Sequence, residues 1–587
     1  MKQRYKKLLS LVLALSMVTG LYGCADRGSD VNEVNGQSFS EFIDEIWRDN
    51  VNCDTLSLHY SIANPENYGI TPTEITLGTY SQTDLTSSAA EAEALIAQLQ
   101  CYSYDTLNSQ EQLVYDCTLR ALEYTARLSK YAYYAEPLGP TTGLQTELPI
   151  VLAEYHFYSR KDIDTYIELL KCLPDYFSDI AQYEREKSAA GFFMADSVAD
   201  KIIDQCKTFI SSPETNLLIE HFDSVIADFE GLTTDEITLY REQNREAVLQ
   251  YVIPAYELLI RTLSELRGSA VYPGNLCALP DGAEYFETLV QYDTGSSMTM
   301  KKMQKRLESA VRSSLLSMSA AQLADPKLYD RYAAAEYPTS DPVEGLELLK
   351  KAIQTDFPHL DDVDYSVKYV HESLQDYLSP AMYLIPPFDD RNNNNIYINL
   401  NPEYTGNDLF TTLAHEGYPG HLYQNNYYLA TDQAPILHLL RTRGYTEGWG
   451  TYAELYGYKL AGFDDALAEF MQNNMTAILC LYGLTEIGIH FSGWTPEDTI
   501  SFWSDYGVDE ASASEIYQTL LAEPGVYLPY CIGYLEFIDL RKAAQETLGD
   551  DFSYLDFHTF LLDIGPAPFD IIKKHMDQWL KAAQAKE

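Results

Sequence analysis

The sequence predicts a mainly helical protein, built as one large two-lobed body with a single small antiparallel sheet. Three observations carry this prediction. Long segments place apolar residues three and four positions apart, which is the period of an amphipathic helix. One stretch, residues 366–400, instead has short runs rich in β-branched and aromatic residues. No Pro-, Gly- or Ser-rich linker divides the 587 residues, so we expect the two lobes to be continuous.

The first residues have the pattern of a bacterial secretory signal that ends in a lipidated cysteine. A basic head precedes an apolar run that ends at Val18, and Gly23 stands directly before Cys24. The apolar run is too short to cross a bilayer comfortably. We therefore expect residues 1–23 to be a signal peptide, Cys24 to carry a lipid, and residues 24–37 to be a polar tether. The protein would be exported and lipid-anchored to the bacterial cell membrane, on its extracytoplasmic side; the alternative is an ordinary cleaved signal with an incidental cysteine.

Two blocks of helical pattern follow the tether. Residues 38–280 form the predicted N-terminal helical lobe, and residues 281–587 form the second lobe, which contains the motif described below. The second lobe begins with helices and then changes character. Its predicted strands are residues 366–373, 383–385 and 396–400. Everything after Glu403 returns to helical spacing, so the sheet is expected immediately before the helix that carries the motif.

The charge of the chain limits its partners. With 87 acidic and 40 basic residues the formal net charge is −47, so the surface repels nucleic acid and anionic lipid. The sequence has no GxSxG segment of a serine hydrolase and no GxGxxG or GxxxxGK[ST] segment for nucleotides. Nucleic acid is therefore not an expected partner, and contact with the membrane is expected through the lipid on Cys24 alone. The oligomeric state is left open.

The most informative segment is HEGYPGH, at residues 415–421. A zincin holds its metal with HExxH on one helix, where two imidazoles lie one turn apart and the glutamate reaches the metal-bound water. Here the second histidine comes six positions after the first, and a regular helix would separate the two rings by roughly 120° in azimuth. Pro419 and Gly420 supply a distortion, because proline interrupts the helix and glycine tolerates unusual dihedral angles. We therefore expect a broken turn that brings His421 back toward His415.

A third metal ligand is expected from Glu447, near the start of the following predicted helix. With His415 and His421 it forms the two-histidine, one-glutamate set of catalytic zinc sites, which leave a fourth position for water. One Zn2+ ion is therefore the expected cofactor, although cobalt would fit the same donors. Glu416 would activate the water as general base. Glu454, on the same face of that helix, could orient a ligand histidine, or it could be an ordinary solvated glutamate.

Several motifs resemble those of one bacterial family. HEGYPGH and TEGWGTYAE are preceded by YLIPPFDDRNNNNIYINLNP and followed by EIGIHFSGWTPED, PGVYLPYCIG and FHTFLLDIGPAPFD. Over most of the chain these segments look like the family catalogued as domain of unknown function 885. That family is regarded as peptidase-like with relatives of the HExxH type, so the resemblance implies a zincin-like body of the gluzincin kind with the ligands and base named above. Family members often have histidine where this chain has Leu422, and aspartate where it has Glu486.

A peptidase of this kind also needs a hydrogen-bond donor that stabilises the oxyanion of the tetrahedral intermediate. In helical metallopeptidases such a donor is commonly a tyrosine or histidine of a later helix. Tyr530 in PGVYLPYCIGY is the first candidate, and His490 and His558 are the others. Each has a structural alternative, because tyrosines usually pack and a lone histidine on a helix is commonly a satisfied core residue.

The predicted function is zinc-dependent hydrolysis of peptide bonds by metal-activated water at the cell surface. A peptide is the expected substrate, and IYINL, residues 396–400, is expected to be an exposed edge strand that accepts it in extended form through main-chain hydrogen bonds. The alternative is a lipid-anchored protein that binds peptides without cleaving them, which the retained Glu416 argues against. Side-chain preference and the choice between endo- and exopeptidase action are left open.

Overall fold

The computed structural model describes residues 37–584, apart from residues 73, 373–374, 376–377 and 402–408. The predicted signal peptide, Cys24 and almost all of the predicted tether lie outside the described residues. None of the described helices combines the length and the apolar character that a membrane-spanning segment requires. Helices make up most of the described chain, so the mainly helical prediction is confirmed.

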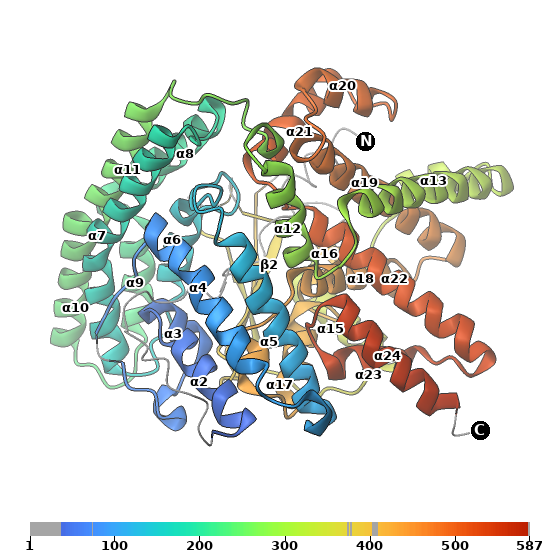
Figure 1. Ribbon diagram of the computed structural model, residues 1–587, viewed down its shortest axis with the longest axis horizontal. Helices are drawn as coiled ribbons and strands as arrows, with labels where there is room; N and C mark the ends of the chain where they lie inside the picture. The colour runs from blue at the N-terminus through green and yellow to red at the C-terminus, as the bar shows by residue number, and fades with distance from the viewer. Residues whose placement is uncertain (1–36, 73, 373–374, 376–377, 402–408, 585–587) are drawn as a thin grey trace.

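The first part of the chain is a succession of helices. They are α2 (Phe39–Val51), α3 (Thr55–Ser61), α4 (Gln82–Leu99), α5 (Ser109–Leu128), α6 (Leu144–Ala153), α7 (Arg160–Ala190), α8 (Asp196–Phe209), α9 (Leu217–Ala227), α10 (Thr234–Ala247) and α11 (Ile253–Leu266). Capping boxes begin several of them, as at Ser38 and Asn108, where the side chain and a glutamate three residues later satisfy the first backbone N–H groups. Figure 1 shows α7, α8, α10 and α11 together on one side of the molecule, with α4 and α5 in front.

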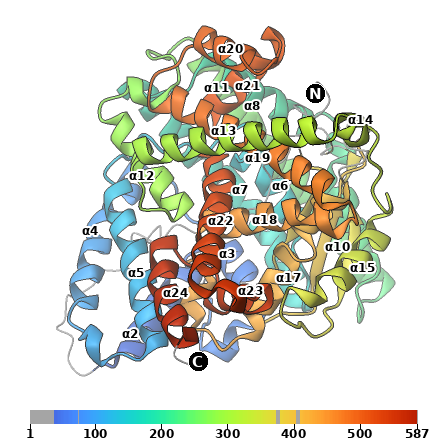
Figure 2. The same ribbon diagram turned by 90° about the vertical axis from the view of Figure 1, so that its right-hand side faces the viewer.

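The second part begins with helices and returns to them after the sheet, as predicted. Its helices are α12 (Gly282–Thr294), α13 (Met300–Ala324), α14 (Leu328–Ala333), α15 (Pro342–Ala352), α16 (Leu409–Glu416), α17 (His421–Ala430), α18 (Arg443–Leu460), α19 (Asp465–His490), α20 (Pro496–Ser504), α21 (Glu510–Ala522), α22 (Leu528–Leu548), α23 (Tyr554–Ile564) and α24 (Phe569–Gln584). In Figure 2 the long helix α13 lies across the top of this part against α19, and α22 runs through its middle past α18.

The small sheet between α15 and α16 is mixed, and the prediction of an antiparallel sheet was wrong. Its strands are β1 (Tyr365–Tyr369), β2 (Ala381–Leu384) and β3 (Asn394–Ile398). β3 is central and pairs antiparallel with β2 but parallel with β1. Short apolar runs indicate strands, but strand direction depends on how the connections pass across the sheet, and composition does not encode that. The IYINL strand is therefore not an edge, and β2 is the edge strand that packs against α16.

Buried apolar side chains gather in two large clusters. One lies among α7 to α11 and includes Leu170 and Phe177. The other contains side chains of α2, α4 and α5, such as Trp47, together with side chains of the second part, such as Trp449. The first helices of the chain thus share a core with the last ones. The lobe boundary near residue 280 stays a prediction.

Helices α18 and α22 cross with their backbones almost in contact. A Cβ atom built on Gly448 would lie 2.5 Å from the carbonyl carbon of Gly533, and one on Gly533 would overlap the carbonyl oxygen of Gly444. Glycine in a helix interior is intrinsically less stable than alanine by about 1 kcal/mol. Its presence at this crossing is explained by the close approach, which fixes the position of α22 relative to α18.

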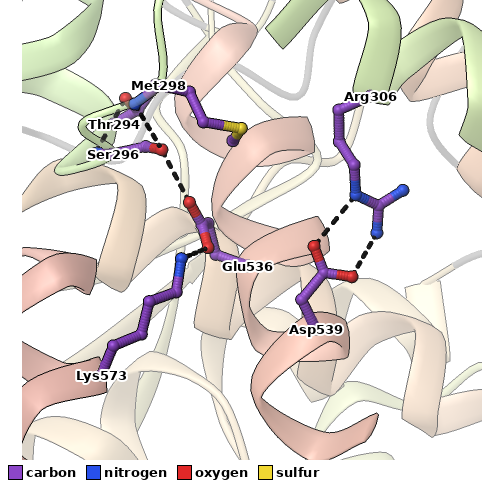
Figure 3. A network of polar contacts seen from close by, with 7 residues as sticks. All are labelled: Thr294, Ser296, Met298, Arg306, Glu536, Asp539 and Lys573. Atoms are coloured by element: carbon purple, nitrogen blue, oxygen red, sulfur yellow. Dashed lines mark hydrogen bonds and ion pairs between the residues drawn. The ribbon is translucent and has the colours of Figure 1, made fainter. Parts of the chain in front are cut away.

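A buried carboxylate joins α22 to two other segments (Figure 3). Glu536 accepts hydrogen bonds from the Ser296 hydroxyl at 2.6 Å and from the Lys573 ammonium at 2.5 Å. Ser296 lies in the turn between α12 and α13, and Lys573 lies on α24. Because Glu536 is almost fully buried, these partners offset the cost of removing its charge from water. Nearby, Arg306 of α13 donates two hydrogen bonds, at 3.0 and 2.7 Å, to Asp539 of α22.

The helix crossing predicts that one substitution has a large effect on stability at one position of α18 and a small effect at another. Gly448→Ala should lower the free energy of unfolding by about 2 kcal/mol or more, because the added carbon overlaps the backbone of α22. Gly457→Ala is the matched control, since its added carbon would lie 3.1 Å from the Ala414 side chain and should change the free energy by less than about 1 kcal/mol. Denaturant unfolding measures both. Equal stability of the two variants would contradict the proposed packing constraint.

Candidate metal centre

The helix that begins the HEGYPGH motif breaks where the sequence predicts. α16 ends and α17 begins on either side of the Pro419–Gly420 pair. A Cβ on Gly420 would overlap the carbonyl oxygen of His415, so the turn requires glycine there. The indole N–H of Trp449 donates to the carbonyl oxygen of Pro419 at 2.8 Å and fixes the turn from α18. The rings of His415 and His421 consequently lie with centroids 4.7 Å apart.

Three side-chain donor atoms converge at this turn. Oε2 of Glu447 lies 3.7 Å from Nε2 of His415 and 3.7 Å from Nε2 of His421. The three donor atoms all lie within 4.8 Å of one another, and all three residues are buried. A tetrahedral zinc ion with bonds of about 2.0–2.2 Å separates its ligands by about 3.3–3.6 Å. The observed spacing is therefore close to what one ion requires.

The charges at the cluster also suit a cation. Among the described residues, Nε2 of His421 and Oε2 of Glu447 are buried without a hydrogen-bond partner, which is costly for polar atoms that bind nothing. Burial opposes ionisation of Glu447, but the two imidazoles hold its pKa well below the usual range. Burial also opposes protonation of His415, yet Glu447 and Glu454 raise its pKa to about 10. The local field therefore favours positive charge.

Two residues of α18 fix the His415 ring. Nδ1 of His415 lies 3.2 Å from Oε2 of Glu454, a contact that turns Nε2 toward Glu447. Glu454 is buried, so it is not the solvated glutamate of the alternative interpretation. Gly450 leaves room for the ring, because a Cβ there would lie 2.5 Å from Nε2 of His415. Sequence reasoning missed Gly450, although its place beside Trp449 in the glycine-rich EGWG segment was a visible signal.

Glu416 lies beside the cluster and faces a small cavity. Its Oε2 accepts the backbone N–H of Tyr383 at 2.9 Å, so the edge strand β2 holds the carboxylate in place. Ala381, the first residue of β2, lines the same cavity, as does Tyr530. Burial raises the pKa of Glu416, while the two neighbouring histidines lower it. Oε2 of Glu416 is thus held by a hydrogen bond, and its carboxylate lines the cavity.

Tyr530 is brought to this cavity by the first turn of α22. Its ring centroid lies 6.2 Å from that of His415, with the two planes 28° apart. Burial and the nearby negative charge of Glu447 raise its pKa well above the usual range. The first turn is itself held by Glu486, whose buried carboxylate accepts the backbone N–H groups of residues 526, 527 and 528 at 2.7, 3.4 and 3.1 Å. Sequence reasoning did not assign this positioning function to Glu486.

His490 and His558 do not line this cavity. Nε2 of His490 lies 2.7 Å from the carbonyl oxygen of Leu520, and its Nδ1 accepts a backbone N–H at 3.3 Å. Nδ1 of His558 lies 2.6 Å from the carbonyl oxygen of Asp356, and its Nε2 lies 2.9 Å from the hydroxyl of Tyr452. Both rings are buried and both nitrogens of each have partners, which is the arrangement of the structural alternative.

The fold and the cluster define a class: a mainly helical protein with two histidines and a glutamate gathered at a break between helices. The chain belongs to the family described as "Bacterial protein of unknown function (DUF885)", which matches residues 66–576. The resemblance inferred from the motifs is therefore confirmed. No curated protein matches the sequence.

Two solved structures share the fold. One, described as "the putative lipoprotein from Colwellia psychrerythraea", is 20% identical with a TM-score of 0.79 and covers 93% of this chain and 99% of its own. The other, described as "a putative lipoprotein of unknown function from Shewanella oneidensis", is 18% identical with a TM-score of 0.63 and covers 92% and 100%. A structure described as "a putative oligoendopeptidase F from Bacillus anthracis" reaches a TM-score of 0.30 at 12% identity, over 86% of this chain and 96% of its own, which is too low to support an argument.

The contacts of Glu486 predict a specific loss of stability. Glu486→Gln should lower the free energy of unfolding by about 2–3 kcal/mol, because an amide N–H group would replace a carboxylate oxygen that faces backbone donors. Glu546→Gln is the control, since that side chain is 69% exposed on α22, the helix whose start Glu486 holds, and should change stability by less than about 0.5 kcal/mol. Thermal and denaturant unfolding of both variants measure the difference. Similar stability of the two would show that Glu486 does not hold the turn.

Proposed function

We propose that the protein is a zinc-dependent peptidase in which His415, His421 and Glu447 hold one Zn2+ ion. The observation that carries this proposal is the convergence of their three buried donor atoms within 4.8 Å, beside the carboxylate of Glu416. Structural zinc sites are usually closed by four protein ligands, whereas catalytic sites have three and keep a position for water. A buried carboxylate next to three such donors favours a catalytic site over a structural one.

The chain's own groups then have distinct tasks. A zinc ion held by these three residues would supply Lewis-acid chemistry, for the scissile carbonyl and for the attacking water. Glu416 takes the proton of the attacking water on Oε1, because Oε2 is occupied by the Tyr383 amide, and passes it to the leaving amine. Glu454 holds the His415 ring, and the Tyr530 hydroxyl donates a hydrogen bond to the developing oxyanion.

The edge strand β2 offers a binding mode for the peptide. Its first residue, Ala381, lines the cavity together with Glu416, and an edge strand can bind an extended chain through main-chain hydrogen bonds. The sequence suggested that IYINL binds the peptide, but that strand is central, so we assign the binding to β2. Anchoring through a lipid on Cys24, on the extracytoplasmic side of the bacterial membrane, completes the proposal, and the description of two structural relatives as lipoproteins supports it.

Metal analysis tests the ligand set. The purified protein should contain about one zinc ion per chain, and His421→Ala should weaken zinc binding by more than about 100-fold, the upper range for changes outside the ligand shell. His359→Ala is the control, because that histidine side chain is 86% exposed and belongs to no cluster with His421. Equal zinc in wild type and His421→Ala would contradict the assignment.

Substitution of the proposed base separates catalysis from metal binding. Glu416→Gln should keep its zinc but lower the hydrolysis of a peptide library by about 100-fold or more, because the amide cannot take a proton. Peptide cleavage and zinc content are measured on the same preparation. Full activity of Glu416→Gln would remove its role as base. A zinc-loaded wild type that cleaves nothing in the library would instead favour the peptide-binding protein.

A further inference from the structure

A half-buried arginine lies close to the candidate metal centre. Arg443 is the first residue of α18, four positions before Glu447, so the two side chains project from one face of the helix with Cβ atoms about 6 Å apart. Its positive charge acts on Glu447, Tyr530, Asp293 and Glu486, since each contributes to raising its pKa against the opposing effect of burial. The charge of Arg443 is therefore felt by a proposed metal ligand, Glu447, and by Tyr530, which lines the cavity.

The guanidinium of Arg443 makes no hydrogen bond or ion pair with any described residue. Its Nε is fully buried without a partner, while the side chain as a whole stays partly exposed. Elsewhere in the described chain, arginines in comparable positions are paired, as Arg441 is with the Asn425 side chain at 2.7 Å. The buried Nε leaves a charge-assisted hydrogen bond unmade, which a bound anion could restore.

The carboxylates near Arg443 do not pair with it. Glu447 faces the two histidines, and Glu486 accepts three backbone N–H groups at the start of α22. Asp293 lies at no ion-pair distance from Arg443, and burial raises the pKa of Asp293 to about 6 although Arg443 lowers it. The donors of the guanidinium fork are thus available to an anion that the chain does not supply.

We propose that Arg443 binds the C-terminal carboxylate of the peptide substrate, and that the protein removes residues from the C-terminal end of short peptides. This inference rests on the proposed peptidase function. A carboxylate suits the planar fork, which binds it through two parallel hydrogen bonds. Arg443 and Glu447 are one helical turn apart, so a carboxylate bound by Arg443 would place the C-terminal end of the peptide close to the cluster.

A comparison of matched substrates tests the inference with the unmodified, zinc-loaded protein. Peptides of one sequence are offered as the free acid and as the C-terminal amide, and each is also made with Glu or Gln at the last position. The free acids should be cleaved with kcat/KM at least about 100-fold above the amides, whichever side chain is present. Preference for Glu over Gln in both amides and acids would show a side-chain carboxylate at Arg443 and overturn the C-terminal assignment.

Variants show whether the preference belongs to Arg443. Arg443→Gln should reduce the acid-to-amide ratio to below about 10, and Arg443→Lys should restore it in part, because lysine keeps the charge without the fork. Arg306→Gln, which removes a half-buried guanidinium from its contact with Asp539, is the matched control and should keep the wild-type ratio. Binding of the two peptides to Glu416→Gln, with and without Arg443→Gln, gives a second readout by calorimetry.

The outcomes separate this inference from the function on which it rests. Equal cleavage of acid and amide by the wild type overturns the role of Arg443 and leaves the peptidase in place. An Arg443→Gln variant that loses zinc or thermal stability while its acid-to-amide ratio stays at the wild-type value shows an arginine that balances buried carboxylates, and overturns the inference as well. A wild type that cleaves neither peptide, and binds neither as Glu416→Gln, defeats both proposals.

Discussion

Two glycines of α18 allow other groups to approach its backbone closely, and the candidate site depends on both of them. Gly450 admits the ring of His415 on one face, and Gly448 admits the backbone of α22 on another. The same helix supplies Glu447 and Glu454, so the proposed ligand and the group that orients His415 belong to one rigid unit. A methyl group in either position would separate side chains that have to meet within a few ångströms.

The second part of the chain contains several buried carboxylates, and each has a different compensating partner. Glu454 faces an imidazole, Glu486 faces the backbone donors of a helix start, and Glu536 is neutralised by Lys573. This is how a chain with a net charge of −47 can place several acids in its interior. Removing a partner from any of them would leave an isolated charge, which costs far more than the loss of one surface ion pair.

Sequence reasoning succeeded where the cause is local and failed where it is distant. The break at Pro419–Gly420 follows from the chemistry of two adjacent residues, so it could be predicted together with the approach of His415 and His421. The direction of β1 in the sheet could not, because its pairing with β3 is decided by the connection between them. The need for glycine at positions 448 and 450 of α18 could not be predicted either, because it depends on the distant segments that pack against them. Tyr530 reaches the cavity, whereas the two histidines proposed beside it have backbone partners elsewhere.

The contacts between α5 and α24 restrict which segments of such a chain can be exchanged during evolution. Arg120 pairs with Asp570, and Asp116 accepts a hydrogen bond from Lys574 at 2.7 Å, so early and late segments share one surface. A gene fragment that encoded the second part alone would leave α24 without these partners and would expose the apolar faces that α2, α4 and α5 cover. Recombination between relatives would have to exchange nearly the whole chain at once, in keeping with a family match that spans residues 66–576.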